Sequence, residues 1–234
     1  MSPLLIGMLG ILLMPLFVAS WRLNLLALTG QGLIMAWIGY QLDPFMSSAH
    51  AWLSLFDLLV VRSLGAPLAL YAVMRAHKAL PSGDVLPPNL MSWTMAIAAV
   101  LLSFRFAEMM VPVDSPLESD AQTFVAVATA ALLLGLLLLA TQTGPFSQMV
   151  GVLRIENAIA LFELGAATQP PRSAGAADAE PALLELATHH GHALSLTIAQ
   201  TVILVLTVWL FRWYLQVLPP PTSGKVSAVE GPRS

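Results

Sequence analysis

The chain has 234 residues, of which 57% are hydrophobic and only 10% are charged, and its formal net charge is −3. Apolar stretches of about membrane length recur along it, so the composition predicts a polytopic membrane protein of the bacterial inner (plasma) membrane type. The absence of cysteine excludes thiolate-ligated iron–sulfur clusters, cysteine zinc sites, disulfides and c-type haem attachment. The lipid bilayer is therefore the first predicted partner, and no basic patch indicates a nucleic acid.

Seven apolar stretches are each close to the roughly 20 residues that a helix needs to cross the hydrocarbon core, although the first and fifth are short. Backbone polar groups find no water in lipid, so we expect helices rather than open strands. The predicted spans are 3–20, 23–42, 52–74, 90–111, 124–140, 148–167 and 194–215. The expected fold class is an all-α polytopic membrane protein with about seven transmembrane helices, in one domain over residues 1–218.

Charged residues of the predicted loops separate by sign, which indicates an orientation. Under the positive-inside rule, the N-terminus is expected outside and the C-terminus in the cytoplasm. Basic residues on the predicted cytoplasmic side are Arg22, Arg75, Lys78, Arg212, Lys225 and Arg233. Residues on the opposite side are Asp43, Asp114, Glu118, Asp120, Asp178, Glu180 and Glu185, with Arg172 the one basic residue among them.

The composition of the connecting segments predicts how they behave. Residues 81–88, rich in Pro and Gly, are expected to form a tight cytoplasmic loop. Residues 169–181 are expected to form a mobile external loop, and residues 219–234 a disordered cytoplasmic tail. Because no Lys or Arg precedes Arg22, the first stretch lacks the positive region of a secretory signal and is expected to be an uncleaved span.

The third predicted span carries a charge near its middle. Arg62 cannot easily reach the interface from there, so it is expected to face a carboxylate or a wet cavity inside the protein. Asp57 lies five residues earlier and would point to a different face of an α-helix, so the two residues are expected to have different partners. Pro67 is expected to kink the helix after the arginine.

In the fourth span, Arg105 and Glu108 stand three residues apart near the predicted external end. Residues at this spacing are neighbours on a helix surface. A structural ion pair between the two is therefore expected.

The sixth span holds the residues of greatest functional interest. Glu156 and Glu163 are seven residues apart, which puts them on one helix face about 10 Å apart in depth, and Asn157 follows the first. Carboxyl groups at membrane depth are costly and indicate function, and a ladder of them is what a proton relay needs. The alternative for Glu156 is an ion pair with Arg154 or Arg62 that only joins helices, and Glu163 is equally consistent with an interfacial acid.

Two polar features belong to the last predicted span. The run Thr188-His-His-Gly-His192 includes His189 and His192, which would share a helix face if the span began early. No acidic or cysteine ligand stands at a recognised spacing, so neither a metal site nor a cofactor site is predicted. Gln200, on its own, is more typical of an interhelical hydrogen bond than of a pathway.

The stretch Leu132–Leu164 supports a family resemblance. It contains Leu-Leu-Leu-Gly-Leu-Leu-Leu-Leu-Ala-Thr-Gln-Thr-Gly, then Gly151, and then Glu156 and Asn157. This order resembles component E of hydrogenase-4 and formate hydrogenlyase-type complexes. Arg62 followed by Gly65-Ala66-Pro67 looks like the family's basic residue and its Val-Pro or similar pair. The resemblance covers about residues 23–212, and the last three spans, 124–215, are similar to the K-type small membrane subunit of respiratory complex I.

The resemblance implies a subunit without catalysis of its own, which links a peripheral hydrogenase-type redox module to antiporter-like membrane subunits and takes part in proton or sodium translocation. Glu156 would take the place of the family's buried glutamate, and Arg62 that of its basic residue. The family usually carries a second acid in the last span, whereas the nearest match here is Gln200, which cannot take up a proton. His192 or Glu163 would then substitute, or the chain would couple mainly by electrostatics and shape.

Two other classes of function stay open at this point. A membrane scaffold for assembly needs only packing faces and no ion pathway. A stand-alone secondary transporter is expected to show an internal repeat with interrupted helices, and the two halves of this chain show no convincing repeat.

Overall fold

The protein is described by a computed structural model. The described residues are 2–17, 20–46, 48–76, 90–111, 116–142, 144–167 and 179–217, with the side chains of residues 2, 16, 17, 76, 116–118, 167, 179–194 and 215 left out of the description. The predicted loop 81–88 and the predicted tail 219–234 lie outside these ranges.

Every element within the described ranges is a helix, which confirms the all-α prediction. In chain order they are α1 (Ser2–Phe17), α2 (Trp21–Leu42), α3 (Ala49–Phe56), η1 (Asp57–Gly65), α4 (Ala66–Ala76), α5 (Leu90–Met110), α6 (Pro116–Thr141), α7 (Pro145–Ala167) and α8 (Ala179–Val217). η1 is a π-helix that follows α3 and precedes α4 without a break.

A helix lies over each of the seven predicted stretches, and two of these helices begin well before the predicted span. α6 begins at Pro116 rather than at Phe124, and α8 begins at Ala179 rather than at Leu194. Proline is favoured at the first position of a helix, where its missing N–H leaves no bond unmade. The residues after Ala179 are largely Ala, Leu and Glu, which are strong helix formers, so hydropathy alone underestimated the length of α8.

Within the described residues, five helical segments are long and apolar enough to cross a membrane. These are Trp21–Leu42, Ala49–Arg75, Leu90–Met110, Ser119–Thr141 and Ser195–Tyr214. The apolar part of α1, Pro3–Pro15, is shorter. α7 has 23 residues but carries Arg154, Glu156 and Glu163 within its length. The protein is thus an all-α membrane protein on the strength of its apolar helices.

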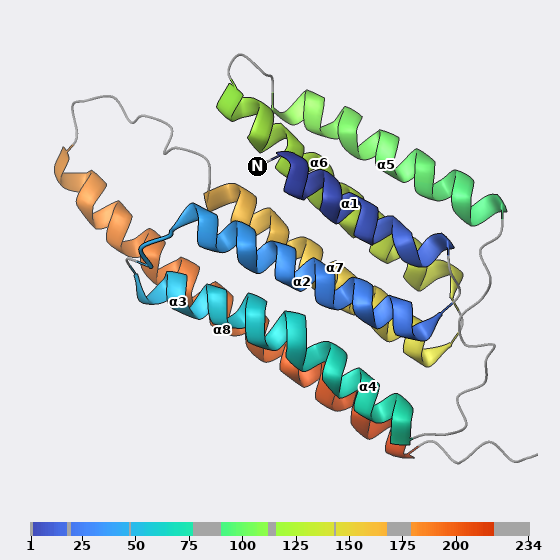
Figure 1. The fold of residues 1–234 in the computed structure, drawn as a ribbon. Coiled ribbons are helices and arrows are strands. Elements are labelled where there is room, and N and C mark those ends of the chain that lie inside the picture. The colour runs from blue at the N-terminus through green and yellow to red at the C-terminus, as the bar shows by residue number, and fades with distance from the viewer. Residues whose placement is uncertain are drawn as a thin grey trace, which may run out of the picture.

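The helices form two layers (Figure 1). α1, α2 and the continuous α3–η1–α4 rod make one layer, and α6, α7 and α8 make the other. Across the layers α1 faces α6, α2 faces α7, and α4 faces α8, while α5 lies beside α6 at one edge. Successive rods run in opposite directions (Figure 1). As a result Arg22 in α2, Arg75 in α4 and Arg212 in α8 all belong to the same end of the bundle.

A layer of buried polar residues divides the interior at mid-height. It contains Gln31 of α2, Arg62 and Ser63 of η1, and Arg154 and Asn157 of α7, all nearly inaccessible to solvent. In each of these helices the polar residues stand between two groups of buried apolar residues. The first apolar cluster includes Leu5, Met8, Met35, Ile38, Leu58, Phe124 and Leu161. The second includes Leu25, Leu28, Leu70, Phe146, Leu153 and Leu204.

α6 and α7 approach each other through two glycines. A Cβ atom on Gly135 would lie 2.9 Å from Cγ1 of Ile155, and one on Gly151 would lie 3.2 Å from the backbone N of Leu139. Close approach of backbones through small residues is typical of helix packing in membranes. The pair is therefore held by shape, and it fixes the position of the helix that carries Glu156.

Candidate functional site

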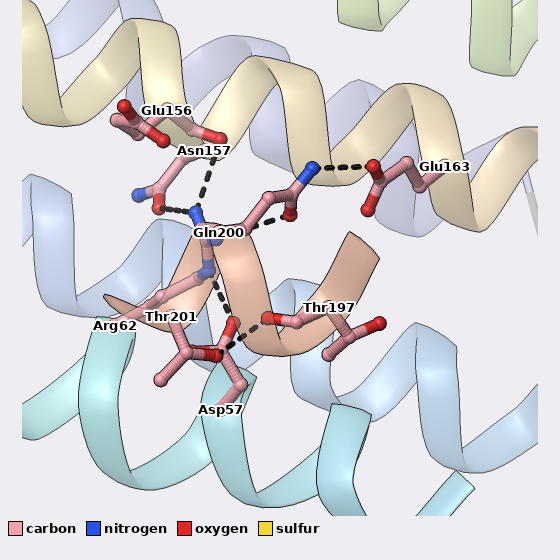
Figure 2. A network of polar contacts seen from close by, with 8 residues as sticks. All are labelled: Asp57, Arg62, Glu156, Asn157, Glu163, Thr197, Gln200 and Thr201. Carbon is pink, nitrogen blue, oxygen red and sulfur yellow. Dashed lines mark hydrogen bonds and ion pairs between the residues drawn. The ribbon is translucent and has the colours of Figure 1, made fainter. Parts of the chain in front are cut away.

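The Arg62 side chain is the centre of a network that joins three elements (Figure 2). Its Nε donates to Asp57 Oδ2 at 2.6 Å. Its Nη1 donates to the backbone carbonyl of Glu156 at 3.0 Å and to Asn157 Oδ1 at 3.3 Å. Its Nη2 donates to Gln200 Oε1 at 3.4 Å. The guanidinium is completely buried and the Asp57 side chain is 5% exposed, so this is an ion pair removed from solvent.

The pairing of Arg62 with Asp57 shows that the prediction of different partners was wrong. In an α-helix, residues five apart are separated by about 140° around the axis, because each turn takes 3.6 residues. A π-helix makes its hydrogen bonds between residues five apart. The backbone N–H of Ala66 still bonds to the carbonyl of Val61 in this way. Asp57 and Arg62 therefore lie one above the other on a single face of η1.

Two features position η1 at this point. Pro67, which has no N–H to donate, follows directly after Ala66, the last residue that bonds in the π register. The kink at Pro67 stays a prediction. On the other side, a Cβ atom on Gly32 would lie 2.7 Å from the Cα of Ser63. The backbone of α2 thus lies against η1, and the Ser63 hydroxyl donates to the Thr29 carbonyl at 3.4 Å.

α8 closes the network with two neighbouring side chains. Gln200 accepts from Arg62 through Oε1 and donates through Nε2 to the Glu163 carboxylate. The Thr201 hydroxyl lies 2.7 Å from Asp57 Oδ1 and 2.9 Å from the Thr197 carbonyl, and its single hydrogen is shared between these two acceptors. A continuous hydrogen-bonded line consequently runs from Thr201 through Asp57, Arg62 and Gln200 to Glu163 (Figure 2).

Glu156 has a different role in the geometry from the one expected. Its backbone carbonyl faces Arg62, whereas its carboxylate points away from the guanidinium (Figure 2). The carboxylate is partly exposed, and no described residue gives it a hydrogen bond or an ion pair. The predicted alternative, an ion pair with Arg154 or Arg62, is therefore wrong for the part of the chain that the structure describes.

Arg154 bonds to a different helix and not to Glu156. Its side chain is buried between α7 and α1, and Nη1 donates to the Leu12 carbonyl at 3.0 Å. Its Nε has no hydrogen-bond partner among the described residues. The two arginines of the polar layer thus use different acceptors, and only Arg62 has a carboxylate.

The remaining predicted residues divide into those that the structure tests and those that it does not. Arg105 Nη1 lies 3.0 Å from Glu108 Oε2, which confirms that ion pair, with side chains 80% and 54% exposed. His189 and His192 belong to α8, but their side chains lie outside the described residues. Within the described residues there is no group of three or more His, Cys, Asp or Glu placed to hold a metal ion.

Five of the predicted relay residues meet around one helix junction: Arg62, Glu156, Asn157, Glu163 and Gln200. Sequence reasoning missed Asp57 as the partner of Arg62, and it missed Thr201 altogether. The available signal for Asp57 was its spacing of five from a buried arginine just before a proline. For Thr201 it was the polar run Thr197, Gln200 and Thr201 on one side of an apolar helix.

No protein-family model, curated protein or solved structure matches this chain. The chemistry of the site is therefore argued from its residues. Three carboxyl groups and two guanidinium groups lie within the apolar part of the bundle, and hydrogen bonds connect two of the carboxyl groups through Arg62 and Gln200. A change of charge on Asp57 or Glu163 would change the hydrogen bonds that the same residue makes.

Proposed function

We propose that this chain is a non-catalytic membrane subunit of a hydrogenase-4 or complex I-like assembly in the bacterial inner membrane. In this role it couples a peripheral redox module to proton or sodium translocation by antiporter-like subunits. Seven membrane-crossing helices with the N-terminus outside and the C-terminus in the cytoplasm belong to the same proposal. The observation that supports it is the hydrogen-bonded line Asp57–Arg62–Gln200–Glu163, which crosses from η1 to α8 to α7 inside an apolar bundle.

The line suits coupling by electrostatics better than conduction by this chain alone. Gln200 stands between Arg62 and Glu163, and an amide cannot take up a proton at neutral pH. It can, however, hold the two charged groups in a fixed relation, because it accepts from one and donates to the other. Protonation of Glu163 would weaken its hydrogen bond with Gln200. Because Gln200 also bonds to Arg62, the change would affect the hydrogen bonds of Arg62 and Asp57. Intramembrane acids at such positions are typical of ion pathways.

The test uses conservative changes in the assembled complex. Glu156→Gln and Glu163→Gln each remove a titratable group and keep the size of the side chain. We expect both variants to assemble, as judged by native electrophoresis, and to lose most of the redox-driven proton uptake into inverted membrane vesicles. Glu108→Gln is the matched control, because Glu108 is an exposed acid near the end of α5. Unchanged proton uptake in both variants would overturn the proposal.

One observation favours a scaffold as the second candidate. The Arg62 guanidinium bonds to four acceptors from η1, α7 and α8, so its main effect is to join helices. A scaffold predicts the reverse outcome: Arg62→Met abolishes assembly, while Glu156→Gln and Glu163→Gln pump normally. Solute transport by the purified chain alone in liposomes would contradict both candidates and indicate a transporter.

A further inference from the structure

One face of α7 carries a line of four residues that are at least partly exposed. Val152, Glu156, Ile159 and Glu163 follow each other at spacings of four, three and four, which puts them on one face of the helix. All four are at least partly exposed, and Ile159 is 40% exposed. On the opposite side of α7 the buried residues are Ser147, Val150, Arg154, Ala158 and Leu161. We call the four residues the α7 stripe.

α8 contacts the α7 stripe at Glu163. Gln200 donates to the carboxylate of Glu163. Seven residues away, about 10 Å along the helix axis, the Glu156 carboxylate points away from Arg62 and meets no polar partner among the described residues (Figure 2). The stripe thus presents an unpaired acid between two aliphatic side chains, Val152 and Ile159.

Lipid is a poor cover for such a surface. An ionisable side chain within a membrane segment is almost always turned to the protein interior, to a partner charge or to a water-filled cavity. The outer sides of α5 and α8 differ from the α7 stripe, because their exposed residues near mid-helix are apolar. Examples are Leu101 at 63%, Leu102 at 62% and Ile203 at 51% exposed. Those surfaces suit acyl chains, whereas the α7 stripe does not.

The charged groups near the α7 stripe indicate what kind of molecule would bind there. Arg62 is already paired with Asp57, and Arg154 is buried on another side of α7 against α1. Neither arginine is within ion-pair distance of the Glu156 carboxylate in the described part of the chain. A basic partner at ion-pair distance from the Glu156 carboxylate, which no described residue supplies, would therefore come from another molecule.

We propose that the α7 stripe is the docking surface for a transmembrane helix of a partner subunit that carries a lysine or arginine at the depth of Glu156. Val152 and Ile159 pack against the aliphatic part of that helix, and the basic group pairs with the Glu156 carboxylate. The inference rests on the proposed function for the existence of a partner subunit, and it names the surface and the chemistry of the contact.

The absence of cysteine from the chain permits a direct test by single-site spin labelling of the full-length protein. Ile159→Cys places the label on the α7 stripe, and Ile97→Cys places it on α5, where the isoleucine is 55% exposed. Each label is probed with oxygen, which dissolves in lipid, and with a water-soluble nickel chelate. The measurement is made in membranes that contain the whole complex and in membranes with this chain alone.

In the complex, we expect the label at position 159 to be severalfold less accessible to oxygen than in the chain alone, and to be shielded from the nickel chelate in both. The label at 97 in the chain alone gives the oxygen accessibility of a lipid-facing site. Equal oxygen accessibility at 159 with and without the complex would overturn the proposal in favour of lipid. Access of the nickel chelate in the complex would overturn it in favour of a water-filled groove.

A charge series separates the basic partner from any other helix. A photoreactive residue at position 159 is cross-linked in the complex, and the cross-linked partner peptide is sequenced. We expect a lysine or arginine within one turn of the cross-linked residue, a lower yield with Glu156→Gln, and the lowest yield with Glu156→Lys. Equal yields in all three proteins, with thermal melting showing each to be folded, would contradict the pairing.

These results are independent of the pumping assay. Loss of pumping in Glu156→Gln together with a lipid-exposed label at 159 would leave the proposed function standing and remove the docking surface. A shielded label with the expected cross-link, together with normal pumping, would support the docking surface and contradict the proposed function.

Discussion

Two different kinds of interaction hold the two sides of α7. Against α6, the glycines at 135 and 151 bring two backbones together: a methyl group at 135 would overlap Ile155, and one at 151 would press on the backbone of Leu139. Against η1 and α8, α7 is held by polar groups, with Asn157 and the Glu156 carbonyl bonded to Arg62 and Glu163 bonded to Gln200. The first contact depends on shape and is indifferent to charge. The second depends on which groups are ionised, so only this side of α7 can respond to a proton.

Removal of the central charge should have the largest effect. Arg62→Met leaves Asp57 as a buried acid without its cation, and we expect a loss of about 3–5 kcal/mol in the free energy of unfolding, as for other buried pairs that lose one member. Denaturant unfolding in detergent, followed by circular dichroism, measures it. The double variant Asp57→Asn with Arg62→Met removes both charges and should be more stable than Arg62→Met alone. A double variant less stable than the single one would contradict the buried ion pair.

The shape-dependent side of α7 is tested by adding one methyl group. Gly135→Ala places a Cβ atom 2.9 Å from Ile155 Cγ1, and we expect a loss of about 1–3 kcal/mol from overpacking. Gly10→Ala is the matched control in a helix, because a Cβ atom there meets nothing within 4 Å. Thermal melting should show a lower midpoint for Gly135→Ala only, at every pH tested. Equal midpoints for the two variants would show that α6 and α7 are not closely packed.

A single polar contact of α8 should have a smaller effect. Thr201→Val keeps the side-chain shape and removes the hydroxyl that bonds to Asp57 Oδ1. Hydrogen bonds between membrane helices contribute about 0.6 kcal/mol on average, and a loss of this size is expected in the same unfolding assay. Thr207→Val is the control, since the exposed Thr207 hydroxyl bonds only to the Ile203 carbonyl of its own helix. If Thr207→Val lost as much free energy of unfolding as Thr201→Val, the loss would come from the lower helix propensity of valine and not from the bond to Asp57.

The smallest effect is expected outside the network. Arg105 and Glu108 form an exposed pair within one helix, and such pairs contribute about 0–1 kcal/mol. Arg105→Gln should therefore leave the unfolding midpoint almost unchanged and should not affect proton uptake by the complex. A loss comparable to that of Arg62→Met would contradict the weak contribution expected of an exposed pair.

The parts of the site that sequence reasoning found are those that local geometry determines. The spacing of Arg105 and Glu108 was enough to predict their contact, because residues three apart are neighbours on any α-helix. Arg62 and Glu156 were found because charges are rare in apolar helices. Their partners could not be found in the same way. Gln200 and Glu163 are 37 residues apart in the sequence, and only the packing of α8 on α7 brings them together.

The sequence by itself determined the class of protein. Long apolar runs with few charges must be helices in lipid, where each backbone polar group needs a partner within the chain. It also identified Arg62, Glu156 and Glu163 as charged residues inside apolar helices. Only the tertiary structure decided how they pair. A register change to a π-helix turned Asp57 toward Arg62, and the position of α8 made Gln200 a bridge to Glu163. Both outcomes depend on contacts between helices, which no single stretch of sequence contains.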